Sequence, residues 1–247
     1  MLRSIQTARA TLRSIRIYYG DRKRAVAMDR LYGNFVRSGD LVFDVGAHVG
    51  DRVASFRRLG ARVVAVEPQQ AMVRALRLLY GRDRSVTIEA VAVGGQPGRA
   101  RMLINSENPT VSSMSSAFVK AAHGAPGWET QRWSAIADVE VTTLDALIAR
   151  HGVPAFIKLD VEGFEAEALS GLSQAVRALS FEFTTIQPDV ALACIEQCVA
   201  MGYLRFNAVL GESQAMIGEW VDGKDIARWL SALPQAANSG DIYAIAA

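Results

Sequence analysis

The amino-acid sequence predicts an α/β protein whose core is a doubly wound, mostly parallel sheet of about seven strands. From residue 40 onward, short apolar runs alternate with segments of helical pattern. The runs are almost continuously apolar, which is typical of strands buried on both faces of a parallel sheet. The closing run, residues 240–247, comes after the last predicted helix and begins at Gly240, and we expect it to pair as a late antiparallel strand.

The expected elements follow from these runs and from the Gly and Pro residues between them. The predicted strands cover residues 41–46, 61–68, 85–93, 100–104, 138–143, 155–163, 178–185, 203–210 and 240–247. The predicted helices cover residues 51–59, 70–79, 165–172, 189–201 and 222–233, with one more beginning after Thr143. Residues 105–137 include a long polar loop, which we expect to shape a binding site. A single domain is predicted over residues 40–247, preceded by a helical extension over residues 1–39.

Composition excludes several classes of protein. The chain has 27 Lys and Arg residues against 25 Asp and Glu, so no strong basic field points to nucleic acid. Cys194 and Cys198 are the only cysteines, too few for a disulfide framework, and we expect both to be buried reduced thiols of a cytoplasmic protein. No apolar run is long enough to predict a transmembrane helix.

The first twenty residues differ from the rest. They carry four arginines and no acid, and their apolar residues recur at helical spacing, which predicts a basic amphipathic helix. Such a helix can pack on the domain or on a second subunit, lie on a membrane surface, or act as a transit peptide. We therefore expect a cytoplasmic protein that can be peripheral to a membrane or homodimeric.

The end of the first predicted strand resembles a ligand-binding turn. Asp44 is followed by Gly46 and Gly50, whose spacing differs from that of dinucleotide-binding loops. Glu67 ends the second strand about twenty residues later, where an acid can accept hydrogen bonds from ribose hydroxyls. This layout indicates a nucleoside ligand without a pyrophosphate. The two acids also suit a positively charged sulfonium.

The predicted strand at residues 155–163 carries three charged side chains close together. Lys158, Asp160 and Glu162 alternate there, which places them on one side for as long as the strand persists. A lysine inside a central strand needs a carboxylate partner, and Asp44 and Glu182 are the candidates. A structural network of ion pairs is the alternative interpretation of these residues.

These motifs together resemble the FkbM methyltransferase family. DVGAHVG, VVAVEPQ, VTTLDAL and IKLDVEGFE occur in the order and approximate spacing of that family, over about residues 40–185, and the closing GDIYAI is also similar. The resemblance implies a class I, Rossmann-like methyltransferase fold with S-adenosyl-L-methionine as methyl donor. It further implies O-methylation of a hydroxyl on a sugar, glycolipid, polyketide or similar metabolite.

The resemblance also assigns roles to individual positions. The glycine turn would contact the methionine part of the cofactor, Glu67 the ribose, and the end of the third strand the adenine. His48 and Ala90 stand where the family more often has asparagine or another polar residue. The predicted cofactor-binding residues are Asp44, Gly46, Ala47, His48, Gly50, Glu67, Pro68, Ala90 and Val91.

For catalysis, we predict that Asp160 is the base or the group that orients the acceptor. Glu162 is the alternate, and Lys158 holds the carboxylates in place. No metal site is predicted, although a magnesium ion between Asp160 and Glu182 is a weaker alternative. Three other functions stay open at this point: a nicotinamide-dependent oxidoreductase, a non-catalytic scaffold, and a nucleic-acid methyltransferase.

Overall fold

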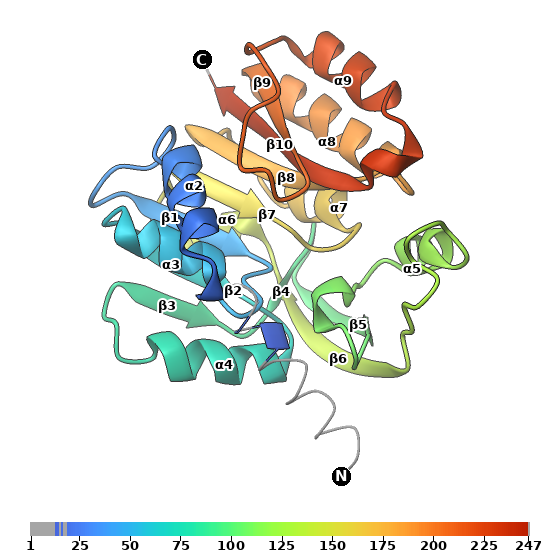
Figure 1. Ribbon diagram of the computed structural model, residues 1–247. Coiled ribbons are helices and arrows are strands. Elements are labelled where there is room, and N and C mark those ends of the chain that lie inside the picture. The colour runs from blue at the N-terminus through green and yellow to red at the C-terminus, as the bar shows by residue number, and fades with distance from the viewer. Residues whose placement is uncertain (1–12, 15, 17–18, 247) are drawn as a thin grey trace.

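The computed structural model describes residues 13–14, 16 and 19–246 of the chain (Figure 1). Its core is a seven-stranded sheet in which five neighbouring strands are parallel, and the penultimate strand in space runs antiparallel to both of its neighbours. In spatial order the strands are β3 (Val86–Glu89), β2 (Arg62–Val66), β1 (Leu41–Val45), β7 (Phe156–Leu159), β8 (Ala178–Thr184), β10 (Ser239–Ala246) and β9 (Tyr203–Leu210). The predicted α/β fold with a late antiparallel strand is confirmed.

A second sheet of three strands accompanies the first. It consists of β4 (Ala92–Val93), β6 (Ala135–Thr142) and β5 (Gly98–Ile104). The single strand predicted over residues 85–93 is therefore wrong, because β3 ends at Glu89 and the chain then crosses to pair with β6. Ala92 and Val93 are buried in the second sheet. The apolar run is therefore continuous in the sequence, and the change from one sheet to the other cannot be recognised from it.

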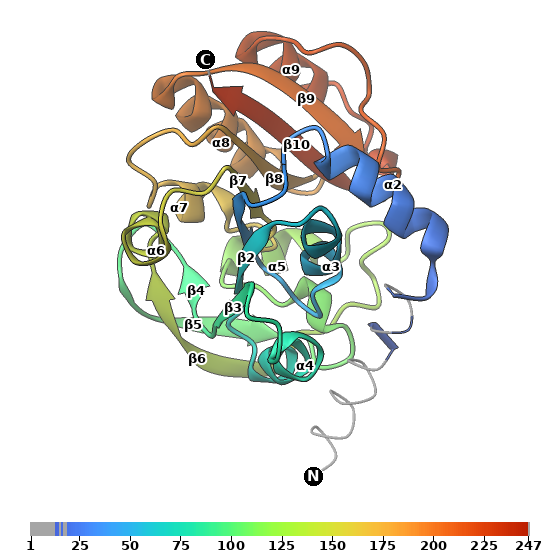
Figure 2. The same ribbon diagram turned by 90° about the vertical axis from the view of Figure 1, so that its left-hand side faces the viewer.

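Helices cover both faces of the large sheet (Figure 2). Helices α6, α7, α8 and α9 contribute to the core on one face, whereas α2 and α3 pack on the other. The helices are α2 (Arg22–Tyr32), α3 (Asp51–Arg58), α4 (Gln70–Tyr80), α5 (Ser116–Ala122), α6 (Leu144–His151), α7 (Glu165–Leu169), α8 (Pro188–Met201) and α9 (Gly223–Ser231), with 3-10 turns η1 (Pro109–Val111) and η2 (Gln235–Ala237). The predicted cap of α6 is confirmed, because the Thr143 hydroxyl accepts the Ala146 N–H at 3.1 Å.

The polar region after β5 is more ordered than the sequence suggested. It contains η1 and α5, and the N–H of Phe118 bonds the Ser115 side chain that caps α5. Phe118 and Trp128 form a small apolar cluster with Val111, which holds this region as a unit beside the end of the large sheet. Local propensity misses this short helix because helices in proteins depend mainly on tertiary packing, and α5 buries Phe118 and Ala122.

Most of the helix predicted over residues 1–20 lies outside the described residues. Helix α2, which follows, buries Met28, Leu31 and Tyr32 in the same cluster as Val42 and Phe156 of the sheet. The domain boundary after residue 39 stays a prediction. Within the residues that the structure describes, no helix is both long enough and apolar enough to span a membrane.

The strand β7 ends four residues earlier than predicted. It stops at Leu159, although the Asp160 N–H still donates to the Val45 carbonyl at 3.0 Å. Glu162 and Gly163 then adopt positive φ angles of 56° and 82°, which extended strand geometry does not allow. Asp160 and Glu162 therefore lie on a loop beyond the strand, at the edge of the sheet where β1, β2 and β8 also end.

Candidate active site

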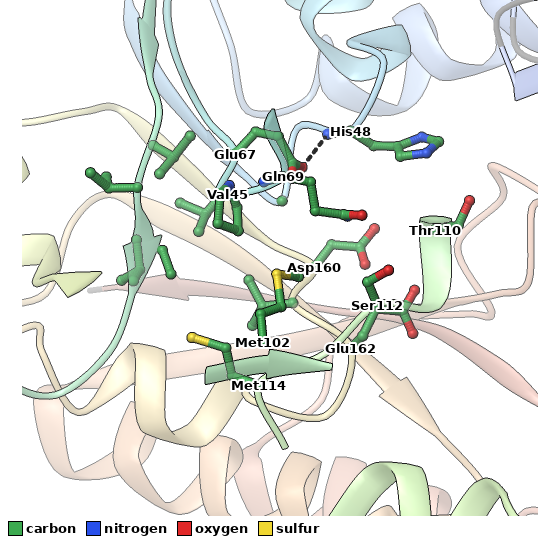
Figure 3. A pocket seen from close by; sticks show the side chains of 17 residues that line it. Val45, His48, Glu67, Gln69, Met102, Thr110, Ser112, Met114, Asp160 and Glu162 are labelled. Carbon is green, nitrogen blue, oxygen red and sulfur yellow. Dashed lines mark hydrogen bonds between the residues drawn. The ribbon is translucent and has the colours of Figure 1, made fainter. Parts of the chain in front are cut away.

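A cavity lies beyond the carboxyl ends of β1, β2 and β7 (Figure 3). This edge of a doubly wound sheet is the usual place for ligand binding. Both sheets and the region after β5 contribute to its wall. The lining residues are Val45, Gly46, His48, Val66, Glu67, Pro68, Gln69, Val91, Ala92, Val93, Met102, Thr110, Ser112, Met114, Asp160, Val161 and Glu162.

The glycine turn after β1 is packed tightly against the loop after β7. Gly46 has a φ of 84°, and a Cβ atom there would lie only 1.7 Å from the backbone oxygen of Asp160. The N–H groups of Gly46 and Ala47 both donate to the carbonyl of Val66. Glycine at position 46 thus allows two loops of the site to touch, and any side chain would separate them.

Glu67 is held rigidly at the cavity wall. Its side chain is only 3% exposed, and its two carboxylate oxygens accept the N–H groups of His48 at 2.9 Å and Gln69 at 2.8 Å. Burial raises the pKa of Glu67 to about 7, against the opposing effect of these two N–H donors. Each carboxylate oxygen can accept a further hydrogen bond, so a ligand hydroxyl can bind without displacing the backbone donors.

Lys158 is buried at the centre of the site, with 1% of its surface exposed. Its ammonium group pairs with Asp160 at 2.6 Å, rather than with either candidate partner predicted from the sequence. Asp160 stands two residues after the lysine, and its N–H still donates to the carbonyl of Val45, so both side chains lie on the same side of the backbone. Burial would lower the pKa of Lys158, but Asp160 and Asp241 outweigh it and hold the pKa above its ordinary value.

Asp44 lies next to this pair but makes no such contact. It stands opposite Lys158 in the register of β1 and β7, it is fully buried, and neither of its carboxylate oxygens has a hydrogen-bond partner among the described residues. Burial raises its pKa to about 7, and the charge of Lys158 opposes the shift. Burial likewise raises the pKa of Glu165 to about 7 and the pKa of Asp241 to about 6.

These raised values predict how stability depends on pH. A carboxyl whose pKa is higher in the folded than in the unfolded chain binds protons preferentially when folded, so its contribution is lost as pH rises through the folded value. As pH rises from about 4 to about 7, the protein therefore loses the stability contributed by Asp44, Glu67, Glu165 and Asp241. The pKa values of Glu162 and Glu182 are raised as well, whereas His48, whose pKa burial lowers, acts in the opposite sense and is outnumbered.

We therefore expect the ligand-free protein to melt about 4–8 °C lower at pH 7.5 than at pH 5.5, which corresponds to about 2 kcal/mol for a domain of this size. Thermal denaturation followed by circular dichroism checks this. Asp44→Asn, which removes one of the titrating groups, should reduce the difference. A melting temperature that rises over this pH interval would contradict the assignment.

The structure brings many of the predicted site residues to one cavity. Of the predicted positions, those that line it are Gly46, His48, Glu67, Pro68, Val91, Asp160 and Glu162. Asp44, Ala47, Gly50 and Lys158 lie outside this lining, and Ala90 faces a neighbouring hollow beside Pro68 and Gln69. The roles of all these residues stay predictions.

Several lining residues were missed from the sequence. Met102 belongs to β5 (Figure 3). Thr110 lies in η1, Ser112 directly follows η1, and Met114 comes two residues later. The polar composition of residues 105–137 predicted a role for the region, but nothing in the pattern singled out these positions. Their placement depends on the pairing of Leu103 with Ser113, which folds the region back over the cavity.

The sheet order β3-β2-β1-β7-β8-β10-β9, together with the glycine turn and the acid that ends β2, defines a class I methyltransferase. The family model described as "Methyltransferase FkbM domain" matches residues 44–236, and the chain belongs to that family. It is a methyltransferase with S-adenosylmethionine as methyl donor. The match disfavours the nicotinamide-dependent alternative.

Solved structures with a similar fold are distant in sequence. A precorrin-6Y C5,15-methyltransferase from Geobacter metallireducens is 13% identical, with 91% of this chain and 87% of that chain covered at a TM-score of 0.43. A TehB-like methyltransferase from Corynebacterium glutamicum is 10% identical, with 90% and 88% covered at 0.46. The 1,6-didemethyltoxoflavin-N1-methyltransferase of Burkholderia thailandensis, solved with S-adenosylhomocysteine, is 12% identical, with 99% and 87% covered at 0.44. A search of curated proteins found no significant match.

The residues of the cavity fit this cofactor. Gly46 leaves backbone exposed at the turn, and Glu67 presents a fixed carboxylate. Val91, Val93 and Met102 provide an apolar wall for a flat base. Buried acids around the turn favour the positive charge of a sulfonium.

Glu67→Ala is expected to weaken the binding of S-adenosylhomocysteine about 10- to 150-fold. The variant removes hydrogen bonds from the ribose to a charged acceptor, which contribute about 1.5–3 kcal/mol each. Isothermal titration calorimetry measures the effect, and Glu129→Ala, at an exposed position after α5, is the matched control. Wild-type affinity in the Glu67 variant would show that this carboxylate does not bind the ribose.

Proposed function

We propose that the protein transfers the methyl group of S-adenosylmethionine to a hydroxyl of a sugar, glycolipid, polyketide or similar metabolite. One observation carries the proposal: two carboxylates, of Asp160 and Glu162, line the cavity together with the hydroxyl-bearing side chains of Thr110 and Ser112. The cofactor supplies a methyl group made electrophilic by its positively charged sulfur. A hydroxyl, unlike a thiolate or a neutral amine, needs a nearby base before it attacks such a carbon efficiently.

The two carboxylates are suited to different tasks. Although burial opposes it, Lys158 holds the pKa of Asp160 below its usual range, so this carboxylate is charged and fixed in place. It can accept a hydrogen bond from the acceptor hydroxyl and orient it. Burial and the neighbouring charge of Asp160 raise the pKa of Glu162 well above its ordinary value, so its ionised form is a stronger base than an ordinary carboxylate, and Glu162 is the alternate group to take the proton.

The cavity wall has an apolar and a polar part. Val91, Val93, Met102 and Met114 bring apolar side chains, whereas the polar groups of Thr110, Ser112 and Glu162 lie on the other side in Figure 3. A polar wall next to the acids supports an acceptor rich in hydroxyl groups, because its remaining hydroxyls find hydrogen-bond partners there. Residues from η1 and its flanks would then distinguish one acceptor from another.

The proposal is tested with S-adenosylmethionine that carries an isotopically labelled methyl group. Sugars, glycolipids and hydroxylated polyketides are offered as acceptors, and matched amines and thiols serve as controls. We expect label in a methyl ether, identified by mass spectrometry and by the chemical shift of the methyl group. Label found only on nitrogen, sulfur or carbon would contradict the proposal, and its absence from every acceptor would favour the non-catalytic scaffold.

We also propose that the protein acts in the cytoplasm without a nucleic-acid partner. The nearly balanced charge supports the second part, and the buried free thiols of Cys194 and Cys198 support the first. Contact with a membrane surface, or with a second copy, through residues 1–20 belongs to the same proposal. Removing those residues should leave cofactor binding intact, because the cavity is lined by residues 45–162.

A further inference from the structure

Three carboxylates, those of Asp160, Glu162 and Glu182, come close together beside the cavity. They belong to two neighbouring strands or to the loop that follows one of them. Asp160 and Glu162 follow β7, whereas Glu182 lies on β8, and the register Leu159 to Phe181 brings Asp160 and Glu182 to the same level. One carboxylate oxygen from each of the three residues lies within 4.8 Å of the other two. Three negative groups this close repel one another unless protons or a cation neutralise them.

The cations of the site do not supply that neutralisation. Lys158 pairs with Asp160 at 2.6 Å, and Asp160 also shares a side-chain hydrogen bond with Glu182, but neither interaction includes the carboxylate of Glu162. Arg52, the nearest buried guanidinium, is paired with Asp51 at 2.5 Å and with Glu212 at 3.1 Å.

Glu162 itself lacks a partner. Its surface is only 6% exposed, and among the described residues no hydrogen bond or ion pair reaches its carboxylate. The side chain nevertheless lines the cavity and lies on the same side as Asp160 and Ser112 in Figure 3. The Oε2 atom of Glu182 is likewise buried without a hydrogen-bond partner in the described part of the chain. A carboxylate that faces the cavity without a donor, next to a buried acceptor without one, points to a ligand that is positively charged.

The loop that carries Glu162 is fixed independently of any such ligand. Glu165 accepts the N–H groups of Val161 at 2.9 Å and Gly163 at 3.3 Å through one carboxylate oxygen. On the opposite side of the loop, the hydroxyl of Ser113 donates to the backbone oxygen of Glu162 at 2.6 Å. The three acids are therefore presented by a rigid backbone, which favours binding of a small ion over rearrangement.

We propose that Asp160, Glu162 and Glu182 bind a hard divalent cation of the Mg²⁺ or Mn²⁺ type. The ligand set is all carboxylate oxygen, which suits these ions and is poor for softer metals. Oxygens bound to one Mg²⁺ are about 3.0 Å apart when adjacent and about 4.2 Å apart when opposite, so the three side chains have to approach one another by roughly 1 Å on binding. The remaining coordination positions face the cavity, where water or an acceptor oxygen completes the shell.

The proposal extends the hydroxyl methylation proposed above and rests on it for the consequence, although not for the binding. A divalent ion at this place would lower the pKa of a coordinated hydroxyl. It would share with Asp160 the task of preparing the acceptor. Binding of the ion, by contrast, depends only on the three carboxylates and is measurable without any acceptor.

The test uses the full chain and Mn²⁺ alone, with free Mn²⁺ quantified by electron paramagnetic resonance. We expect one Mn²⁺ per chain, displaced by Mg²⁺, and at least about tenfold weaker binding in both Glu162→Gln and Glu182→Gln. Glu167→Gln, on the exposed face of α7, is the matched control and should bind as wild type does. Titration with S-adenosylhomocysteine confirms that each variant retains its cofactor site.

The outcomes separate this proposal from the proposed function. Unchanged Mn²⁺ binding in both glutamine variants, or none in the wild-type protein at about millimolar Mn²⁺, would overturn the metal site. Labelled methyl ethers formed equally well with and without a chelator would overturn the metal's part in the reaction while supporting hydroxyl methylation. Binding of Mn²⁺ that both variants lose would support the site even if no hydroxyl acceptor is methylated.

Discussion

Replacement of Asp160 with asparagine is expected to lower the rate of methyl transfer by about 10²- to 10⁴-fold. The change removes a charged oxygen that lines the cavity and that Lys158 holds in position, while it preserves the shape of the side chain. Alignment of the acceptor and removal of its proton both depend on such a group, and a positioned base contributes about this much to a rate. The measurement is single-turnover transfer of labelled methyl to the acceptor that the wild-type protein uses.

Binding of S-adenosylhomocysteine should change little in the Asp160 variant. Asp189→Asn, at an exposed position in the first turn of α8, is the matched control and should transfer methyl groups at the wild-type rate. A wild-type rate in Asp160→Asn would assign Asp160 a structural role and move the search for the base to Glu162.

Replacement of Lys158 with methionine is expected to be the most destabilising of the proposed changes. Methionine keeps much of the side-chain volume but removes the cation that pairs with Asp160 and offsets the charges of Asp44 and Asp241. Breaking a buried ion pair on one side typically destabilises a protein by about 3–5 kcal/mol. For a domain of this size, that corresponds to a melting temperature lower by about 6–20 °C.

The pH dependence separates the charge effect from packing. Protonation at low pH removes the uncompensated charges, so the loss of stability in Lys158→Met should be smaller at pH 5.5 than at pH 7.5. Lys120→Met, at the exposed end of α5, is the control and should melt within about 2 °C of the wild type. An equal loss at both pH values would show that the lysine acts through its volume instead.

The large sheet was predictable because most of its strands are short buried runs bounded by glycines, acids or helices. Asp44 and Glu67 could be placed at one edge of the sheet from parallel topology alone, and the structure puts their strands side by side. The alternation of Lys158 and Asp160 placed their side chains on one side, and the two form an ion pair at 2.6 Å. The alternation does not extend to Glu162, where φ is positive and the backbone is no longer extended.

Other features depend on contacts that local pattern does not encode. The change of sheet between Glu89 and Ala92 is hidden because both sheets bury apolar residues. The position of Ser112 follows from the pairing of Leu103 with Ser113, and the position of Glu162 depends on its positive φ angle. Asp241 reaches the buried charges only because β10 inserts between β8 and β9.

The central claim is that the cavity beside Gly46, Glu67 and Asp160 holds the cofactor and the reacting hydroxyl. The most direct test is a crystal structure of the complex with S-adenosylhomocysteine. We predict that the ribose hydroxyls bind the carboxylate of Glu67, that the chain of the homocysteine crosses Gly46, and that the sulfur faces the side of the cavity with Asp160 and Glu162. A complex with the ribose away from Glu67, or with the sulfur turned away from both carboxylates, would contradict the account.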